Sequence, residues 1–278
     1  MVVFSRAALF VVLAALLYGC STVRFAYENA DAYLRWKVAT YLDLEGEDAE
    51  RLDDLIDELH EWHRRNALPK YVTLAHEASR RIAGGLSRED VVWGYDSARM
   101  QARESLRKAG ELAAPLLDRL TPEQLAHVER RLAEENRKFY RENLRGSERE
   151  RRKKRARMVQ DRLEDWVGSL TREQVKTVRE YAERAPMADE LRERDRKRLQ
   201  QDVIAIIRAR QAGAKLPERL ANWERGREPA YVAALDAWRE QYFTMLLDVD
   251  RSLTPEQRGR VTANLRRYAE EFEALAAR

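Results

Sequence analysis

Two of the four histidines lie one helical turn apart and could do metal or proton-transfer chemistry. His60 and His63 follow Asp57 at three-residue spacing, so a helix places all three on one face. Imidazole and carboxylate groups in this pattern could ligate a metal ion. Trp62 and Leu59 beside them favour instead a packed helix, in which His63 bonds a carboxylate or a carbonyl of a neighbouring helix. No HExxH motif is present, so we expect neither a metal site nor a cofactor.

Other catalytic patterns are missing from the sequence. There is no GxSxG nucleophile elbow and no glycine-rich phosphate loop, and Cys20 is the only cysteine. Acidic residues are so frequent that no pair of carboxylates stands out as an acid and base couple. We therefore expect a protein that binds rather than an enzyme. An enzyme that uses scattered carboxylates and His63 is the alternative.

The first twenty residues have the pattern of an export signal. Arg6 precedes the apolar run Ala7–Leu17, which is shorter than the ~20 residues that span a bilayer. We predict that residues 1–19 are a signal peptide and that residues 20–278 form the mature protein. An ordinary secretory signal with a chance cysteine is the alternative.

The end of this signal resembles the lipobox of bacterial lipoproteins. Leu17, Gly19 and Cys20 match that motif, and Tyr18 stands where a small residue is usual. The resemblance implies that the Cys20 thiol receives a diacylglyceryl group, that the signal is removed, and that the new amino group is acylated, for instance with palmitate. In Gram-negative lipoproteins, Ser21 after the cysteine implies sorting to the outer membrane, with the body facing the periplasm.

Charge and cysteine content limit the partners. The formal net charge of +4 is the small difference between 52 basic and 48 acidic residues, so there is no electrostatic case for nucleic acid. A single cysteine allows no disulfide within the chain, so packing must hold the exported domain together. The expected partners are the membrane, through the lipid anchor, and other envelope proteins.

A short cassette that starts helices recurs along the chain. In its clearest copy, Leu120-Thr121-Pro122-Glu123-Gln124, the threonine and glutamine form a capping box and the proline fits the first helical turn. Leu120 can pack on Leu125 as a hydrophobic staple. The other copies are at 170–174 and 253–257, with eroded versions at 86–90 and 44–48 and a degenerate candidate at Leu216-Pro217-Glu218.

These helix-capping cassettes and the amino-acid composition predict an all-α protein. Ala, Leu, Glu and Arg dominate, whereas there are only 11 glycines and seven prolines in 278 residues. We predict one domain over residues 20–278, a multi-helix bundle of antiparallel helix hairpins. Phe25, Tyr33 and Trp36 indicate that an amphipathic helix begins close behind Cys20, which keeps the body near the membrane.

The segment from Arg149 to Arg157 is the most basic stretch. Between Glu148 and Arg157 there are seven basic residues and two acidic ones. One interpretation is a site for an anionic envelope component, such as a lipid phosphate or a peptidoglycan carboxylate. The other is a solvated face at the start of a helix, where Glu148 and Glu150 complement the helix dipole.

Two family resemblances follow from these motifs. The lipobox, the cassettes, the run from Trp62-His63-Arg64-Arg65 to Leu68-Pro69-Lys70-Tyr71 and the run from Glu129 to Phe139 resemble a family of Gram-negative lipoproteins known only as a domain of unknown function. The cassettes alone are similar to the LTxxQ motif of the periplasmic chaperones Spy and CpxP, all-α proteins that bind unfolded clients. Helix capping explains the same residues without shared function.

The sequence therefore predicts an outer-membrane lipoprotein that faces the periplasm and acts by binding, in a chaperone-like role or otherwise. A structural adaptor that holds peptidoglycan or lipopolysaccharide through Arg149 to Arg157 is one alternative. An envelope enzyme that uses carboxylates and His63 is the second.

Overall fold

The computed structural model describes residues 22–278, and within them every regular element is an α-helix, as predicted. The predicted signal peptide, residues 1–19, and the predicted lipidation site, Cys20, lie outside the described residues. Among the described helices, none combines the length and the apolar character needed to cross a bilayer. The helices are α2 (Thr22–Glu28), α3 (Ala30–Leu42), α4 (Gly46–Asn66), α5 (Leu68–Ala83), α6 (Arg88–Leu117), α7 (Pro122–Asn143), α8 (Glu148–Val167), α9 (Arg172–Arg184), α10 (Asp189–Arg208), α11 (Ala212–Ala221), α12 (Pro229–Arg251) and α13 (Pro255–Ala276).

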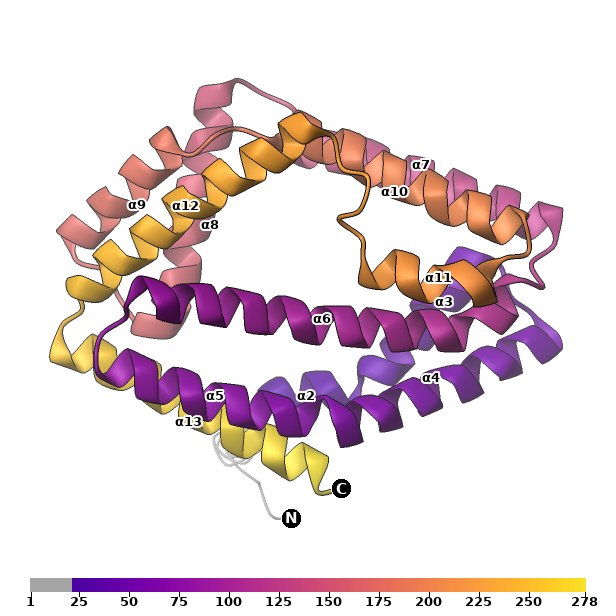
Figure 1. Cartoon of the computed structure of the whole chain (residues 1–278), viewed down its shortest axis with the longest axis horizontal. Coiled ribbons are helices and arrows are strands. Elements are labelled where there is room, and N and C mark those ends of the chain that lie inside the picture. Colours follow the sequence, from indigo (N-terminus) through magenta and orange to yellow (C-terminus); the bar gives the residue numbers. More distant parts are fainter. Residues whose placement is uncertain (1–21) are drawn as a thin grey trace, which may run out of the picture.

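The helices are arranged as a closed frame (Figure 1). Around it, each helix packs on the next in the order α5, α13, α8, α9, α12, α10, α7, α3, α4 and back to α5. The long helix α6 lies across the frame with α11 along its side (Figure 1). The most extensive contacts, α5 with α13 and α6 with α11, join segments far apart in the sequence.

Two apolar clusters stabilise different sides of the frame. One joins α3, α4, α6, α7 and α10 around Leu52, Ile56 and Leu116. The other joins α9 and α12 through Tyr181 and Met245, with side chains of α8 packed against it. Burial of these apolar surfaces supplies the main driving force for folding.

Capping boxes start α6, α7, α9 and α13, as the cassettes predict, and Ser147 with Glu150 forms a further capping box at the start of α8. At α7, Gln124 N donates to Thr121 Oγ1 at 3.2 Å and Thr121 N donates to Gln124 Oε1 at 2.9 Å. The eroded cassette at 44–48 also precedes a helix, but Glu45 makes no side-chain cap bond. The candidate at 216–218 was wrong, because it lies inside α11, which begins at Ala212.

The cassette glutamines also connect one helix start to another. Gln174 Nε2 donates to the Ser252 carbonyl at 3.0 Å, and Gln257 Nε2 donates to the Ser169 carbonyl at 2.9 Å. In each case the acceptor immediately precedes the leucine of the partner cassette. Gln124 repeats this bond with the Asp43 carbonyl, just before the eroded cassette. The cassettes at 170–174 and 253–257 thus form a reciprocal pair, and the cassette at 120–124 bonds to the residue before the eroded one at 44–48.

The expectation of an amphipathic helix behind Cys20 needs correction. Apolar side chains lie on both faces of α3: Val38 and Leu42 pack in the core, whereas Tyr33 and Trp36 are 58% and 62% exposed. Phe25 of α2 is 63% exposed as well. The first described helices therefore leave an aromatic surface uncovered.

Candidate functional site

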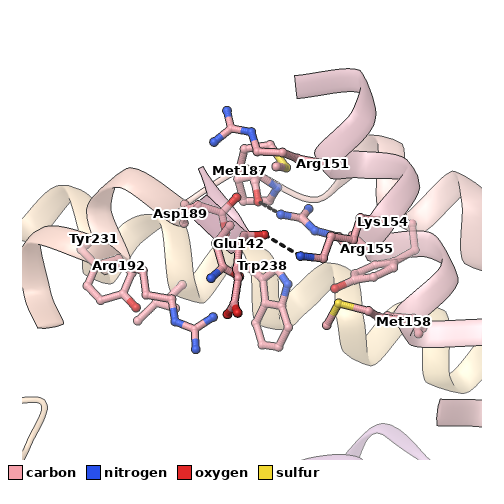
Figure 2. Close-up of a pocket in the computed structure, with 16 residues that line it drawn as sticks. Glu142, Arg151, Lys154, Arg155, Met158, Met187, Asp189, Arg192, Tyr231 and Trp238 are labelled. Carbon is pink, nitrogen blue, oxygen red and sulfur yellow. Dashed lines mark hydrogen bonds between the residues drawn. The ribbon is translucent and has the colours of Figure 1, made fainter. Parts of the chain in front are cut away.

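A cavity of about 380 Å³ lies where α8, α12, the end of α7 and the loop from α9 to α10 meet (Figure 2). Its walls come from four parts of the sequence, so it exists only in the folded chain. It is lined by Glu142, Asn143, Arg151, Lys154, Arg155, Met158, Val159, Tyr181, Pro186, Met187, Ala188, Asp189, Arg192, Tyr231, Leu235 and Trp238.

Aromatic and apolar side chains form the inner wall of the cavity. Tyr181 of α9 is only 2% exposed, and burial raises its pKa to about 12, so its hydroxyl stays protonated. Trp238 stacks on Tyr242 with ring centroids 5.3 Å apart, which fixes the indole in place. Met158 at the opening is 55% exposed, and a thioether side chain adapts readily to an apolar ligand.

The half-buried guanidinium group of Arg155 lies beside this apolar wall. Arg155 donates from Nη1 to the Ala185 carbonyl at 2.9 Å and from Nη2 to the Pro186 carbonyl at 3.1 Å. These bonds use two of its five N–H groups. Burial lowers the pKa of Arg155, yet among the described residues no carboxylate lies within ion-pair distance of it. Its guanidinium group is hydrogen-bonded to carbonyl groups after the end of α9, and the negative charge of Asp189 acts on it from beyond ion-pair distance.

Three further cations surround Arg155. Arg151 pairs with Glu190 at 2.7 Å, and Lys154 donates to the carbonyl of Glu142 (Figure 2). Arg192 lies over the ring of Phe139, 5.4 Å from its centroid. Against these stand two acidic lining residues, Glu142 and Asp189, so the cavity is positively charged.

This combination suits a ligand with two different ends. The free N–H groups of Arg155 and the ammonium group of Lys154 can bind a carboxylate or a phosphate. Trp238, Met158 and Leu235 can cover an apolar chain or ring.

The basic segment that the sequence singled out is divided by the fold. Arg149, Lys153 and Arg157 are exposed, whereas Arg152 turns inward and donates to the carbonyls of Ala182 and Ala185 at 2.9 and 3.0 Å. The segment is thus partly a solvated face, partly a cap on α9 and partly a wall of the cavity. The basic segment could be recognised in the sequence from its charge. The apolar wall of the cavity could not, because its residues are spread over three helices.

His60 and His63 do not converge with Asp57 on a common site. Tyr27 Oη lies 3.2 Å from His63 Nδ1, and Tyr71 Oη lies 3.3 Å from His63 Nε2. The expected carboxylate or carbonyl partner was wrong, because tyrosines of α2 and α5 occupy both ring nitrogens. Asp57 instead pairs with Arg35. Among residues 22–278, no group of three or more His, Cys, Asp or Glu side chains could hold a metal ion.

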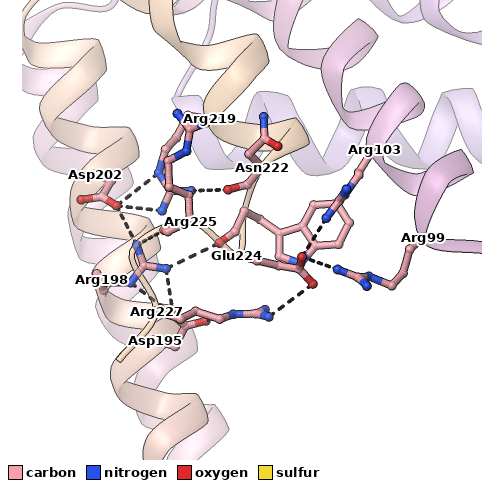
Figure 3. A network of polar contacts seen from close by, with 11 residues as sticks. Arg99, Arg103, Asp195, Arg198, Asp202, Arg219, Asn222, Glu224, Arg225 and Arg227 are labelled. Carbon is pink, nitrogen blue, oxygen red and sulfur yellow. Dashed lines mark hydrogen bonds and ion pairs between the residues drawn. The ribbon is translucent and has the colours of Figure 1, made fainter. Parts of the chain in front are cut away.

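Several acidic residues that could have taken part in catalysis are held by arginines. Asp195 Oδ1 accepts from Arg198 at 2.8 Å and its Oδ2 pairs with Arg227 at 3.2 Å (Figure 3). Glu224 pairs with Arg99 and Arg103 in the same network. These ion pairs tie α10 and α6 to the turn between α11 and α12, which is a structural role.

Comparisons with known proteins identify a family but no function. Residues 40–231 match a family described as a family of unknown function, DUF6279. The matched region contains the two stretches, 62–71 and 129–139, that carried the predicted resemblance. No curated protein and no solved structure matches the chain. Because the match covers more than half of the chain, the protein belongs to DUF6279, a family of unknown function.

Proposed function

We propose that this protein is a lipid-anchored, non-catalytic binding protein of the outer membrane, facing the periplasm, and that its cavity binds an anionic amphiphile. The carrying observation is Arg155, a half-buried guanidinium that forms no ion pair with a described carboxylate and lies beside the aromatic wall of Tyr181 and Trp238. A ligand with one acidic end and an apolar body satisfies both parts of this cavity.

The anchor rests on the lipobox-like sequence before Cys20. If Cys20 is acylated, the mature chain has no free thiol, because there is no other cysteine. Protein recovered from cell membranes is expected to resist a thiol-reactive maleimide after denaturation. Labelling of Cys20, or recovery of the protein in the soluble fraction, contradicts the anchor.

The ligand class is tested with three detergents that share a dodecyl chain. Dodecyl phosphate, neutral dodecyl maltoside and dodecyltrimethylammonium are titrated below their critical micelle concentrations by calorimetry, with tryptophan fluorescence as a second readout. We expect measurable binding of the phosphate and much weaker binding of the other two. Equal affinities would show that only the apolar wall contributes and would overturn the anionic part of the proposal.

Matched variants locate the binding site. Arg155→Gln is expected to weaken dodecyl phosphate binding by about tenfold or more, because a charge-assisted hydrogen bond is lost. Lys153→Gln is the control, since Lys153 is exposed on the same helix and does not line the cavity. Lys154→Gln tests the opening separately in case Arg155→Gln disturbs α9. Equal effects of the Arg155 and Lys153 substitutions contradict this site.

The chaperone-like form of the proposal depends on the LTxxQ resemblance. Gln174 is fully buried and Gln257 nearly so, so these two glutamines offer no surface to an unfolded client, whereas Gln124 is half-buried. Failure of the purified protein to suppress client aggregation at stoichiometric ratio excludes this form and leaves amphiphile binding intact.

The adaptor alternative rests on the exposed cations Arg149, Lys153 and Arg157. Their joint replacement by Gln is expected to abolish co-sedimentation with cell wall if the protein ties the membrane to peptidoglycan. Unchanged sedimentation of this variant excludes the adaptor. The enzyme alternative gains no support from His63, whose ring nitrogens face two tyrosines.

A further inference from the structure

Helix α3 has an apolar outer face with no partner in the described chain. Tyr33 and Trp36 lie one turn apart on this face, with ring centroids 6.0 Å from each other, and Leu34 beside them is 39% exposed. Phe25 adds a third exposed ring on α2. A helix with apolar side chains on opposite faces is normally buried. We therefore expect another surface to contact the exposed face of α3.

The acidic side chains of these two helices are already neutralised. Asp31 pairs with Arg35 at 2.8 Å, and Glu28 pairs with Arg278. Lys37 of α3 lies over the ring of Tyr41 on the same helix. The surface around the exposed rings therefore carries no unpaired acid of α2 or α3 that would repel an anionic layer.

We propose that Phe25, Tyr33 and Trp36 insert into the lipid surface as a second membrane contact. The inference rests on the proposed acylation of Cys20, because α2 begins only two residues later and two extended residues span about 7 Å. The acyl chains would hold α2 and α3 at the headgroup level, where tryptophan and tyrosine rings are favoured. Stable membrane attachment generally needs more than one signal, and an aromatic face supplies another.

The contact has a consequence for orientation. A flexible lipid tether alone lets the helical domain rotate relative to the membrane. A tether together with an inserted helix surface fixes which face of the domain points to the periplasm. The start of α12 lies at the opposite edge of the frame from α2 (Figure 1). The cavity, which includes Tyr231 at that end of α12, then lies at the edge of the frame that is far from the bilayer surface (Figure 1).

The test uses single cysteines in the full, lipidated chain. Trp36→Cys and Val232→Cys, both exposed helical sites, are labelled with a polarity-sensitive nitrobenzoxadiazole dye and reconstituted in phosphatidylethanolamine and phosphatidylglycerol vesicles. We expect the dye at 36 to shift to the blue and to be quenched by spin-labelled lipid, whereas the dye at 232 is quenched by aqueous iodide. Circular dichroism checks folding, and Tyr33→Cys replaces Trp36→Cys if the latter loses helix.

The outcomes separate this inference from the anchor. Vesicle-bound protein whose dye at 36 is open to iodide overturns the inference and leaves the anchor standing. Shielding at 36 that disappears when the protein is diluted among more vesicles indicates a second copy of the chain and also overturns it. Two labels per chain instead of one show that Cys20 carries a free thiol, in which case the anchor and the inference both fall.

Discussion

Gln174 and Gln257, 83 residues apart, exchange side-chain amide hydrogen bonds of 2.9 and 3.0 Å in both directions. Each Oε1 atom also accepts from the backbone N–H of its own capping threonine, at 2.9 Å for Thr171 and 3.0 Å for Thr254. Both amides are therefore used within the protein, and the starts of α9 and α13 form one hydrogen-bonded unit.

Replacement of Gln174 by Ala is expected to destabilise the fold strongly. The substitution removes the capping box, takes away the side-chain donor of the Ser252 carbonyl and removes two of the four hydrogen bonds of the buried Gln257 amide, so we expect a loss of about 2–4 kcal/mol in the free energy of unfolding. Gln124→Ala removes a similar box at a half-buried site and should cost about 1 kcal/mol. Urea denaturation measures both, and equal losses would show that the pairing adds nothing to the cap.

The capping boxes were predictable because a cap depends on five consecutive residues. The pairing was not, because nothing in the sequence says which cassette meets which. The aromatic helix behind Cys20 shows a similar limit. Its apolar residues can be read from the sequence. Which of them face solvent cannot be predicted, because that depends on which helices pack against α3.

The stability of the protein is expected to decrease in mild acid because of two histidines. Burial, with the nearby His60, lowers the pKa of His63 below its ordinary 6.5, and burial is also the main cause of the lowered pKa of His60. As the pH falls, the unfolded chain therefore binds protons before the folded one does. The free energy of unfolding should begin to fall as the pH drops below about 7.5, and it should keep falling while the histidines of the folded chain hold fewer protons than those of the unfolded chain, as linkage requires.

Histidine variants assign this pH dependence. His63→Gln should flatten the fall, and His60→Gln should flatten it further. His76→Gln is the control, because its side chain is exposed on α5. Urea denaturation at each pH provides the measurement, and a slope that survives the double replacement of His60 and His63 rules out these residues as its source.

Asp195 is expected to stabilise the protein more than a surface acid does. Its side chain is 12% exposed and pairs with Arg198 and Arg227, so Asp195→Asn leaves each of these partly buried guanidinium groups with one carboxylate partner instead of two. We expect a loss of about 1–3 kcal/mol. Asp248→Asn, which breaks an exposed pair with Arg251, should cost at most about 0.5 kcal/mol. Equal melting temperatures of the two variants would contradict a structural role for the network.

The charge pattern of the sequence predicts part of the candidate site. Arg149 to Arg157 stood out in the sequence, and Arg151, Lys154 and Arg155 of that run do line the cavity. Tyr181 and Trp238 could not be assigned to it, because aromatic residues at helical spacing usually form core. His63 was correctly placed on a packed helix, but choosing its partners required knowing that α2 and α5 flank α4.

The close contact between α6 and α11 allows a sharp test of how these two helices pack. A Cβ atom on Gly110 would lie 2.9 Å from Pro217 Cα and 3.1 Å from Pro217 N, and these backbone atoms cannot rotate away. Gly110→Ala is therefore expected to force the helices apart and to cost about 1–3 kcal/mol, despite the better helix propensity of alanine. Gly94→Ala is the matched control on the same helix, because a Cβ there meets nothing within 4 Å. It should stabilise the protein by about 0.5–1 kcal/mol. Opposite shifts of the urea midpoint for the two alanines are the expected result, whereas equal stabilisation would mean that α11 does not pack against α6 at Gly110.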